Sequence, residues 1–219
     1  MPFTSVLHDF VATYGYFAVF VIIALESAGV PLPGETTLVS AAIFASRGAL
    51  DIRAVIACAA AGAILGDNGG YWVGREFGFP LALRYGRYVR IDEPRLKLGQ
   101  YLFQRHGGKI VFFGRFVAVL RAYAALLAGI NHLSWGRFFT FNALGGIVWA
   151  SVFGVGGYVA GRAFEHFARP VGFAILVAAV IGAITAQRFY AHHERALIAE
   201  AEAALPGPLQ APKKPGARG

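Results

Sequence analysis

Four charged side chains interrupt two apolar stretches of the sequence. Glu26 and Glu35 lie on either side of a Val-Pro-Leu-Pro-Gly turn, and Arg115 and Arg121 interrupt the apolar segment 110–130. A charge inside a bilayer is costly unless it is paired or hydrated, so such residues usually mark a functional site. Carboxylates can exchange protons, whereas arginine keeps its charge and offers a planar fork for phosphate or carboxylate. These residue types indicate a transport site for an anion.

The spacing of these charges predicts two helical hairpins, at 15–45 and 110–130. Each arm of the first is about half of the roughly 20 residues that cross a bilayer, so we expect it to enter and leave on one side. Arg115 and Arg121 are six residues apart, which leaves them about 120° from a common face of a continuous helix. They converge only if the chain breaks between them, as it does in a hairpin.

Each candidate also has a structural interpretation. Glu35 follows a break and could cap the next helix, or it could act in proton coupling or gating together with Glu26. Arg115 and Arg121 could hold a phosphate head group, or they could form structural ion pairs with Glu26 or Glu35. The sequence leaves these alternatives open.

Asp67 is a fifth candidate, inside a predicted span that carries glycine at every fourth position from Gly62 to Gly78. The glycines predict a close-packing helix face, within one chain or between two copies. Asp67 either hydrogen-bonds a neighbouring helix or belongs to a proton path. Asn142 and Trp149 are interpreted as packing or interface residues.

Composition places these residues in a polytopic membrane protein. The chain has 219 residues, of which 57% are hydrophobic and only 15% charged. Its net charge of +8 resides mostly in loops without an interleaved aromatic platform, so no nucleic-acid partner is expected. A single cysteine, Cys58, excludes an intramolecular disulfide and a cysteine-based metal site. No histidine has the spacing of a zinc site, and we expect neither a metal nor a cofactor.

We therefore predict an all-α polytopic membrane fold, with one membrane domain over residues 1–190. It comprises the two hairpins, full spans at 54–74, 138–160 and 171–187, an interfacial connection at 75–109, and a short interfacial amphipathic helix before residue 15. Residues 191–219 are expected to form a polar tail that is largely disordered after 205. Most lysines and arginines outside the apolar segments fall on the side of the 75–109 connection and the C-terminus, which predicts that this side is cytoplasmic.

The order of elements occurs twice. A hairpin, a short polar loop and a glycine-rich span are followed later by the same series, and the segment 70–75 (Gly-Tyr-Trp-Val-Gly-Arg) resembles 157–162 (Gly-Tyr-Val-Ala-Gly-Arg). An odd number of crossings separates the two copies, so the repeats should be inverted. Many secondary transporters build a midplane site in this way.

At these positions the chain resembles the DedA family, within the wider group of membrane proteins that carry a VTT or SNARE-associated domain. The resemblance covers about residues 15–165. It rests on Leu25-Glu26-Ser27, Pro31-Leu32-Pro33-Gly34-Glu35, Gly66-Asp67, Tyr71, Gly74-Arg75, Gly78, Gly114-Arg115-Phe116, Arg121, Ala128-Gly129, Phe138, Asn142, Gly145 and Trp149.

The resemblance implies facing re-entrant hairpins and an inner-membrane lipid transporter in bacteria. Bacterial members are associated with returning undecaprenyl phosphate or phospholipid across the inner membrane, in dependence on proton motive force, and eukaryotic relatives resemble scramblases. The family pattern implies essential roles for Glu26, Glu35, Arg115 and Arg121. Many members have prolines in the second hairpin where this chain has alanines, and alanine favours continuous helix. We keep the hairpin, because one continuous span would bury both arginines.

The leading hypothesis is a flippase for an anionic lipid carrier, with undecaprenyl phosphate as the expected substrate. Arg115 and Arg121 would bind the phosphate, and Glu26, Glu35 and Asp67 would couple or gate transport. The alternatives are a proton-coupled antiporter of a small cation or drug, a phospholipid scramblase, and a factor that stabilises other membrane proteins. An enzyme is not expected, since no nucleophile or metal cluster accompanies the arginines. A homo-oligomer remains compatible with the sequence.

Overall fold

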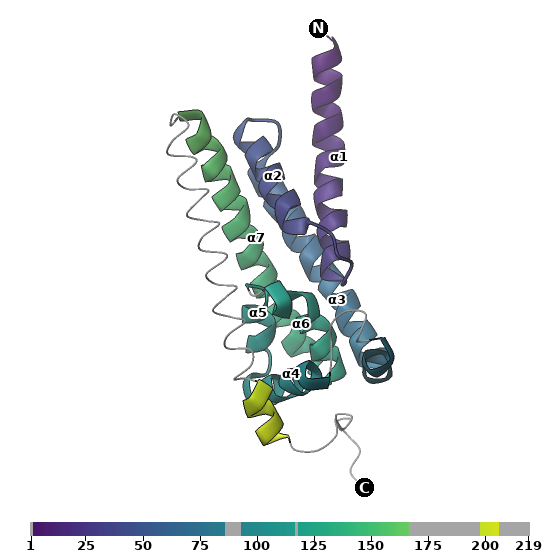
Figure 1. The fold of residues 1–219 in the computed structure, drawn as a ribbon. Coiled ribbons are helices and arrows are strands. Elements are labelled where there is room, and N and C mark those ends of the chain that lie inside the picture. The colour runs from purple at the N-terminus through teal and green to yellow at the C-terminus, as the bar shows by residue number, and fades with distance from the viewer. Residues whose placement is uncertain (1, 86–92, 117, 167–197, 206–219) are drawn as a thin grey trace.

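The computed structural model describes residues 2–85, 93–116, 118–166 and 198–205, and these residues form helices and turns without a strand (Figure 1). Residues 198–204 are also helical. The labelled helices are α1 (Pro2–Ser27), α2 (Gly34–Ser46), α3 (Ile52–Tyr85), α4 (Glu93–His106), α5 (Lys109–Gly114), α6 (Ala118–Ile130) and α7 (Trp135–His166).

In the described part of the chain, two helices are long and apolar enough to cross a membrane. The candidate spans are Ile52–Gly78 in α3 and Trp135–Arg162 in α7. At a rise of about 1.5 Å per residue each is about 40 Å long, which exceeds the roughly 30 Å of bilayer hydrocarbon. They contain the predicted spans 54–74 and 138–160. The predicted span 171–187 lies outside the described residues, as does the expected disorder after 205.

Both predicted hairpin segments are helix–turn–helix units. The first consists of α1 and α2, joined by a turn in which Gly29 adopts a φ of 106° that favours glycine. In the second, α5 ends at Gly114 and α6 begins at Ala118. The helix therefore breaks between Arg115 and Arg121 although alanine favours continuation. α2 and α6 have 13 residues each, about 20 Å, too short to cross a bilayer.

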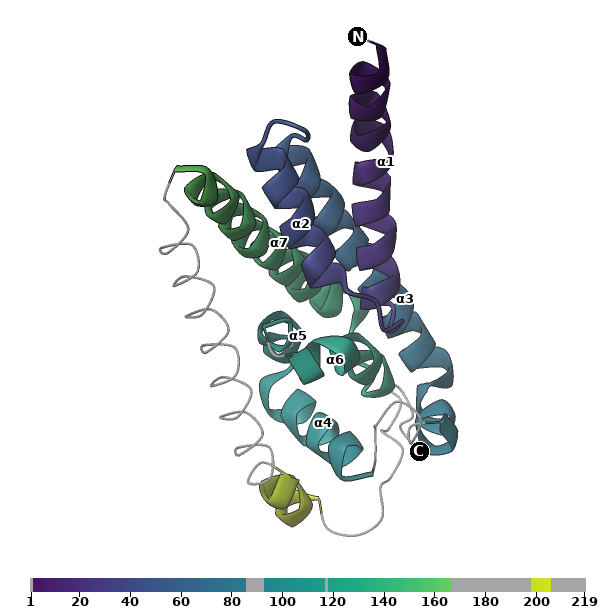
Figure 2. The same cartoon turned by 45° about the horizontal axis from the view of Figure 1, so that its top comes forward.

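The turns of both hairpins lie part-way along the long helices. Figure 1 shows the turn between α1 and α2 beside the middle of α3, with α2 returning toward the end from which α3 starts. The α5/α6 hairpin lies at the opposite end, where α4 packs against it (Figure 2). The two turns therefore approach each other from opposite ends of α3 and α7.

The glycines of α3 pack within this chain. An ideal Cβ on Gly62 or Gly66 would lie 2.5 Å from Phe20 O or 2.1 Å from Ala24 O, both in α1. One on Gly74 would lie 2.2 Å from Leu126 O in α6. Because no side chain fits between these backbones, the glycine face seats α1 and α6 on successive stretches of α3.

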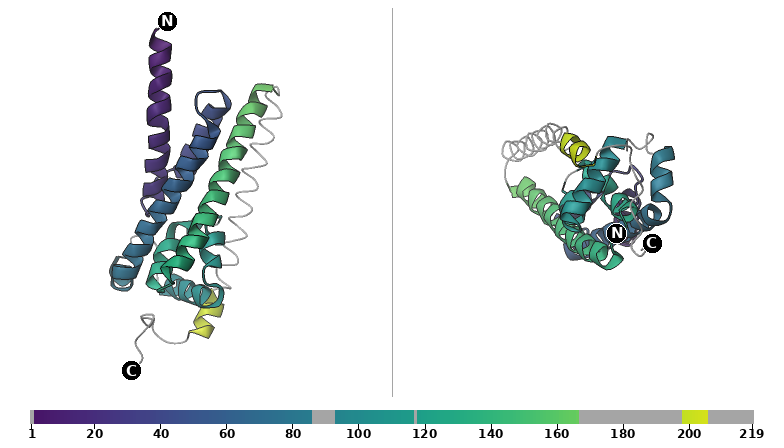
Figure 3. Two further views of the ribbon diagram at one scale, coloured as in Figure 1. Left: turned by 180° about the vertical axis from the view of Figure 1, so that it is seen from behind. Right: turned by 90° about the horizontal axis from the view of Figure 1, so that it is seen from below.

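The repeated order of elements is accompanied by antiparallel long helices. α1–α2–α3 is followed by α5–α6–α7, and α3 and α7 run in opposite directions (Figure 3). The matching sequence segments place an arginine over a tyrosine one helical turn earlier, at 5.9 Å from the ring centroid for both Arg75 over Tyr71 and Arg162 over Tyr158. The local pattern is thus shared by both halves.

The structure corrects two boundaries. α1 is continuous from Pro2 to Ser27, so the expected separate helix before residue 15 is its first half. Gly15 alone costs a helix only about 1 kcal/mol, and no proline interrupts the segment after Pro2. α3 likewise continues to Tyr85, so the connection predicted to start at residue 75 begins later.

Candidate functional site

Arg121 joins the two hairpins by bridging the two glutamates of the first. It projects from the first turns of α6, whereas Glu26 lies at the end of α1 and Glu35 at the start of α2. Arg121 Nη2 lies 2.5 Å from Glu26 Oε1, and Arg121 Nη1 donates to Glu35 Oε1 at 2.5 Å. The sequence-predicted residues Glu26, Glu35 and Arg121 therefore form one cluster, held by charge-assisted hydrogen bonds.

Trp149 of α7 supports the same guanidinium. Arg121 Cζ lies 5.1 Å from the centroid of the indole ring, which is the geometry of a cation–π contact. The Trp149 side chain is fully buried and packs with Phe153 and the surrounding apolar core. The Arg121 guanidinium thus contacts both the two carboxylates and a buried aromatic ring.

Arg115 forms a second, deeper cluster with Asp67 and Asn142. Its Nη2 donates to Asp67 Oδ2, to Asn142 Oδ1 at 2.6 Å and to Ala63 O at 3.3 Å. Asn142 Nδ2 in turn donates to Ile64 O at 3.2 Å. Of the two explanations considered for Asp67, the hydrogen bond to a neighbouring helix is present, and it fixes the end of α5 to α3 and α7.

Two glycines of α7 make room for the Arg115 side chain. An ideal Cβ on Gly145 would lie 3.1 Å from Arg115 Cδ, and one on Gly146 would lie 3.5 Å from Arg115 Cζ. Asn142, these glycines and Trp149 follow one another at spacings of three or four residues, so they share one face of α7. This face carries both a ligand of Arg115 and the ring beneath Arg121.

The two clusters differ in accessibility. The side chain of Arg115 is only 4% exposed, whereas Arg121 is 16% and Glu35 49% exposed. The clusters are close enough for Arg115, Arg121, Asp67 and Glu26 to interact electrostatically. We call the five side chains Glu26, Glu35, Asp67, Arg115 and Arg121 the charged centre. A ligand that approaches it from outside meets the more exposed Glu35 and Arg121 first.

Fully ionised, the centre has an excess of negative charge. Three carboxylates and two guanidiniums give a formal charge of −1 for the five side chains. Glu26 Oε2 is buried beside Gly34. An anion can therefore bind here only if it displaces a carboxylate from arginine or if a carboxylate takes up a proton. Among the described residues no group of three His, Cys, Asp or Glu side chains could hold a metal ion.

Sequence comparison assigns the chain to a family. The VTT domain family matches residues 32–159, more than half of the chain. The chain is 31% identical to the protein DedA of Escherichia coli over 163 residues, 71% of this chain and 74% of the relative. The chain belongs to the DedA family of VTT-domain membrane proteins.

Two further DedA family relatives are bacterial membrane proteins whose names describe them as uncharacterized. An uncharacterized membrane protein of Mycobacterium tuberculosis is 40% identical over 86% of this chain and 88% of its own length. One from Synechocystis is 43% identical over 67% of each chain. No solved structure matches the chain significantly. This DedA family protein is accordingly a bacterial membrane protein, and its family match includes Glu35, Asp67, Arg115 and Arg121 but begins after Glu26.

Sequence reasoning missed two contributors to this DedA family site. Asn142 and Trp149 were interpreted as packing residues, yet one binds Arg115 and the other lies under Arg121. Their separation of seven residues, about two helical turns with glycines between, is a signal that a face of α7 receives long side chains. An asparagine inside a predicted membrane span also indicates a polar partner buried next to it.

Proposed function

We propose that this protein is an inner-membrane lipid transporter that moves an anionic lipid, with undecaprenyl phosphate as the substrate, and that proton motive force drives it. The supporting observation is the position of Arg121, a partly exposed cation between two carboxylates where the two hairpins meet. In this proposal both hairpins are re-entrant. The side of α4 and the C-terminus is cytoplasmic, in keeping with its basic residues.

Protonation of the glutamates provides the coupling. With Glu26 and Glu35 ionised, Arg121 has both of its terminal nitrogens occupied. Protonation of both removes two negative charges, so the formal charge of the five groups changes from −1 to +1. A singly charged phosphate head group then neutralises the centre and takes the positions that the carboxylates leave on the guanidinium. Release of the protons restores the ion pairs and expels the lipid.

Arg115 and Asp67 have a supporting role in this cycle. Arg115 contributes a permanent positive charge next to the head group, and Asp67 holds it in place. Arg115 Nη2 already donates to Asp67 and Asn142, so a phosphate takes over this nitrogen only if Asp67 is also protonated. Asp67 is in this way a candidate for a second proton.

Reconstitution tests the proposal. Labelled undecaprenyl phosphate is followed between leaflets of proteoliposomes with and without a pH gradient, for wild type, Arg121→Ala and Arg105→Ala. Arg105 is an exposed arginine of α4 and serves as the matched control. We expect gradient-dependent exchange by wild type and the control, and loss of exchange by Arg121→Ala. Equal rates for all three proteins would remove the phosphate role from Arg121.

A proton-coupled antiporter of a small cation is the second candidate, and the formal charge of −1 favours it. In this case Glu26 and Glu35 bind the cation and Arg121 only locks the hairpins. Glu26→Gln then abolishes substrate binding, whereas an anion carrier keeps binding and changes its pH dependence. A scramblase differs from both because it exchanges phospholipid without a gradient.

A further inference from the structure

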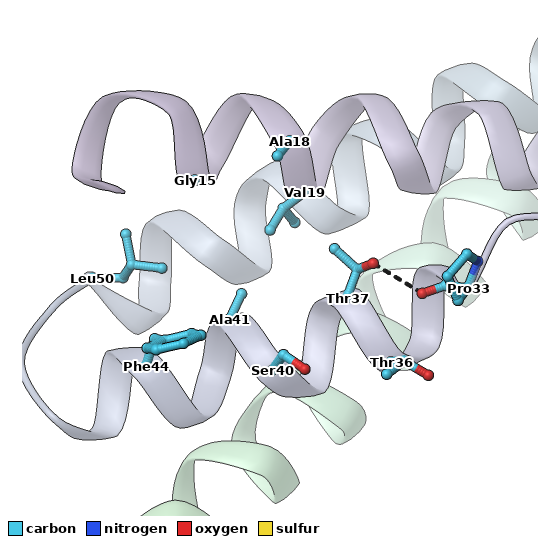
Figure 4. A pocket seen from close by; sticks show the side chains of 10 residues that line it. All are labelled: Gly15, Ala18, Val19, Pro33, Thr36, Thr37, Ser40, Ala41, Phe44 and Leu50. Carbon is cyan, nitrogen blue, oxygen red and sulfur yellow. Dashed lines mark hydrogen bonds between the residues drawn. The ribbon is translucent and has the colours of Figure 1, made fainter. Parts of the chain in front are cut away.

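A groove between α1 and α2 leads away from the charged centre. Its volume is about 360 Å³, which is within the range of pockets that bind small molecules. Figure 4 shows how it forms: small residues on one helix, Gly15 and Ala18, face Ala41 on the other, so the two helices leave a space between them. The turn between α2 and α3 closes one end with Leu50.

The walls of the groove suit hydrocarbon. Most of the lining is apolar, and the hydroxyl of Thr37 already donates to Pro33 O within the same turn of helix (Figure 4). Phe44 lines the groove and is half exposed. Phe17, which precedes the lining residue Ala18 in α1, is also exposed. In a membrane protein such surfaces face lipid, so an alkyl chain is the ligand that these walls accommodate at least cost.

The other end of the groove lies at the first turn of α2, which also carries Glu35. Pro33 and Thr36 line the groove, whereas Glu35, which binds Arg121, stands between them in sequence and is not part of the lining. From Pro33 to Phe44 the helix rises by about 16 Å, roughly half of the hydrocarbon thickness of a bilayer. An apolar groove of about one leaflet's depth that ends within one helical turn of a residue paired with Arg121 suits an amphiphile with an anionic head.

We propose that the groove between α1 and α2 binds one hydrocarbon chain of the anionic lipid whose head group binds at Arg121. The inference rests on the proposed function for the identity of the head group. The hydrocarbon chain would extend from the charged centre toward the turn at 47–51, which the predicted topology places on the outer side. The head group would then lie deeper in the membrane than the end of its hydrocarbon chain. This is the orientation of a lipid that moves inward from the outer leaflet with its head group first.

Binding in the groove can be measured independently of transport. In a full-length Cys58→Ala background, Ser40→Cys places a bimane fluorophore in the groove and Ala61→Cys places one on an exposed position of α3. The proteins are embedded in phosphatidylcholine nanodiscs, and a brominated single-chain alkyl phosphate or alkyl phosphocholine is added as the quencher. We expect stronger quenching by the phosphate than by the phosphocholine at position 40, and equal quenching by both at position 61. Equal quenching by both lipids at both positions would overturn the proposal.

Filling the groove supplies the second test. Ala18→Trp occupies the groove, and Ala61→Trp adds the same volume at an exposed site outside it. Only Ala18→Trp should remove the phosphate preference at position 40 and reduce transport of undecaprenyl phosphate. Transport at the wild-type rate in Ala18→Trp would overturn the groove's role. If wild type transports no lipid while position 40 keeps its preference, the proposed function fails and the groove remains a lipid site.

Discussion

The Arg115 guanidinium and the Asp67 carboxylate form an ion pair in which the side chains are only 4% and 10% exposed. A buried pair of this kind contributes little by itself, because desolvation offsets the attraction, but the loss of one partner leaves an uncompensated charge. The pair therefore determines how α5 attaches to α3 more than how stable the protein is in total.

Asp67→Leu should destabilise the fold by about 3–5 kcal/mol, because Arg115 would remain charged and buried. The double variant Asp67→Leu/Arg115→Leu should recover much of that loss. Thermal unfolding in detergent, compared with wild type and Arg105→Ala, measures the effect as a change in Tm. A single variant as stable as wild type would contradict the assigned pairing.

The backbone contacts of α3 give a second prediction. Gly66→Ala places a methyl group where Ala24 O already lies, whereas nothing lies within 4 Å of a Cβ on Gly69. We expect Gly66→Ala to lose about 1–3 kcal/mol by overpacking. Gly69→Ala should be neutral or stabilising, because alanine is the better helix former by about 1 kcal/mol. The Tm values of the two variants in detergent test this prediction. Equal values for Gly66→Ala and Gly69→Ala would mean that α1 and α3 are not in close contact.

Trp149 should stabilise the position of Arg121 through a cation–π contact, in addition to its own packing in the core. A double-mutant cycle of Trp149→Leu and Arg121→Gln, read out as unfolding free energy, separates the cation–π contact from the cavity that the leucine leaves. We expect a coupling energy of about 0.5–2 kcal/mol. Trp149→Phe, which keeps an aromatic face, is the control and should retain part of the coupling. Additive effects in the cycle would exclude a direct contact.

The helical segment 198–204 should detach from α4 in acid. The Tyr101 hydroxyl donates to Glu200 Oε1 at 2.6 Å and, with Arg105 at 3.0 Å, lowers the pKa of Glu200 below its ordinary 4.5. Since the docked state has the lower pKa, this contribution is complete above pH 4.5 and is lost as the pH falls through the depressed value. The hydrogen-exchange protection factors of 198–204, which are corrected for the intrinsic pH dependence of exchange, should fall in that window.

Glu200→Gln is the matched variant for this effect. Its protection factors should be lower than those of wild type at neutral pH and should not fall further in acid, whereas Glu202→Gln should behave as wild type. An acid response that persists in Glu200→Gln would assign the titration to another group.

Local patterns predicted the hairpins but not all of their partners. The Pro-Leu-Pro-Gly turn and the paired charges indicated the turns of α1/α2 and α5/α6, and the break before Ala118 followed from the cost of burying Arg115 and Arg121 in one span. The predicted half-length first arm was wrong, because α1 is a continuous helix of 26 residues. The sequence could not predict that Asp67 pairs with Arg115 whereas Glu26 and Glu35 pair with Arg121. This pairing depends on how far each hairpin extends along α3 and α7. Re-entry into a membrane and the roles of the five charged residues stay predictions.

The long continuous helices were missed for a different reason. Sequence patterns mark a boundary where polarity changes, as at residue 75, but the helical backbone does not have to end there: α3 continues through Arg75, Gly78 and Pro80. α3 and α1 both extend past such a change.

The closest backbone contacts pair α1 and α6 with the glycines of α3, and α2 with α7, where a Cβ on Gly157 would lie 3.2 Å from Val39 O. α3 and α7 also pack directly against each other. The Arg121–Glu35 bond links α6, which lies on α3, to α2, which lies on α7. Protonation of Glu35 would break that bond and leave each short helix attached to its own long helix, so the two short helices could separate from each other while α3 and α7 stay in contact.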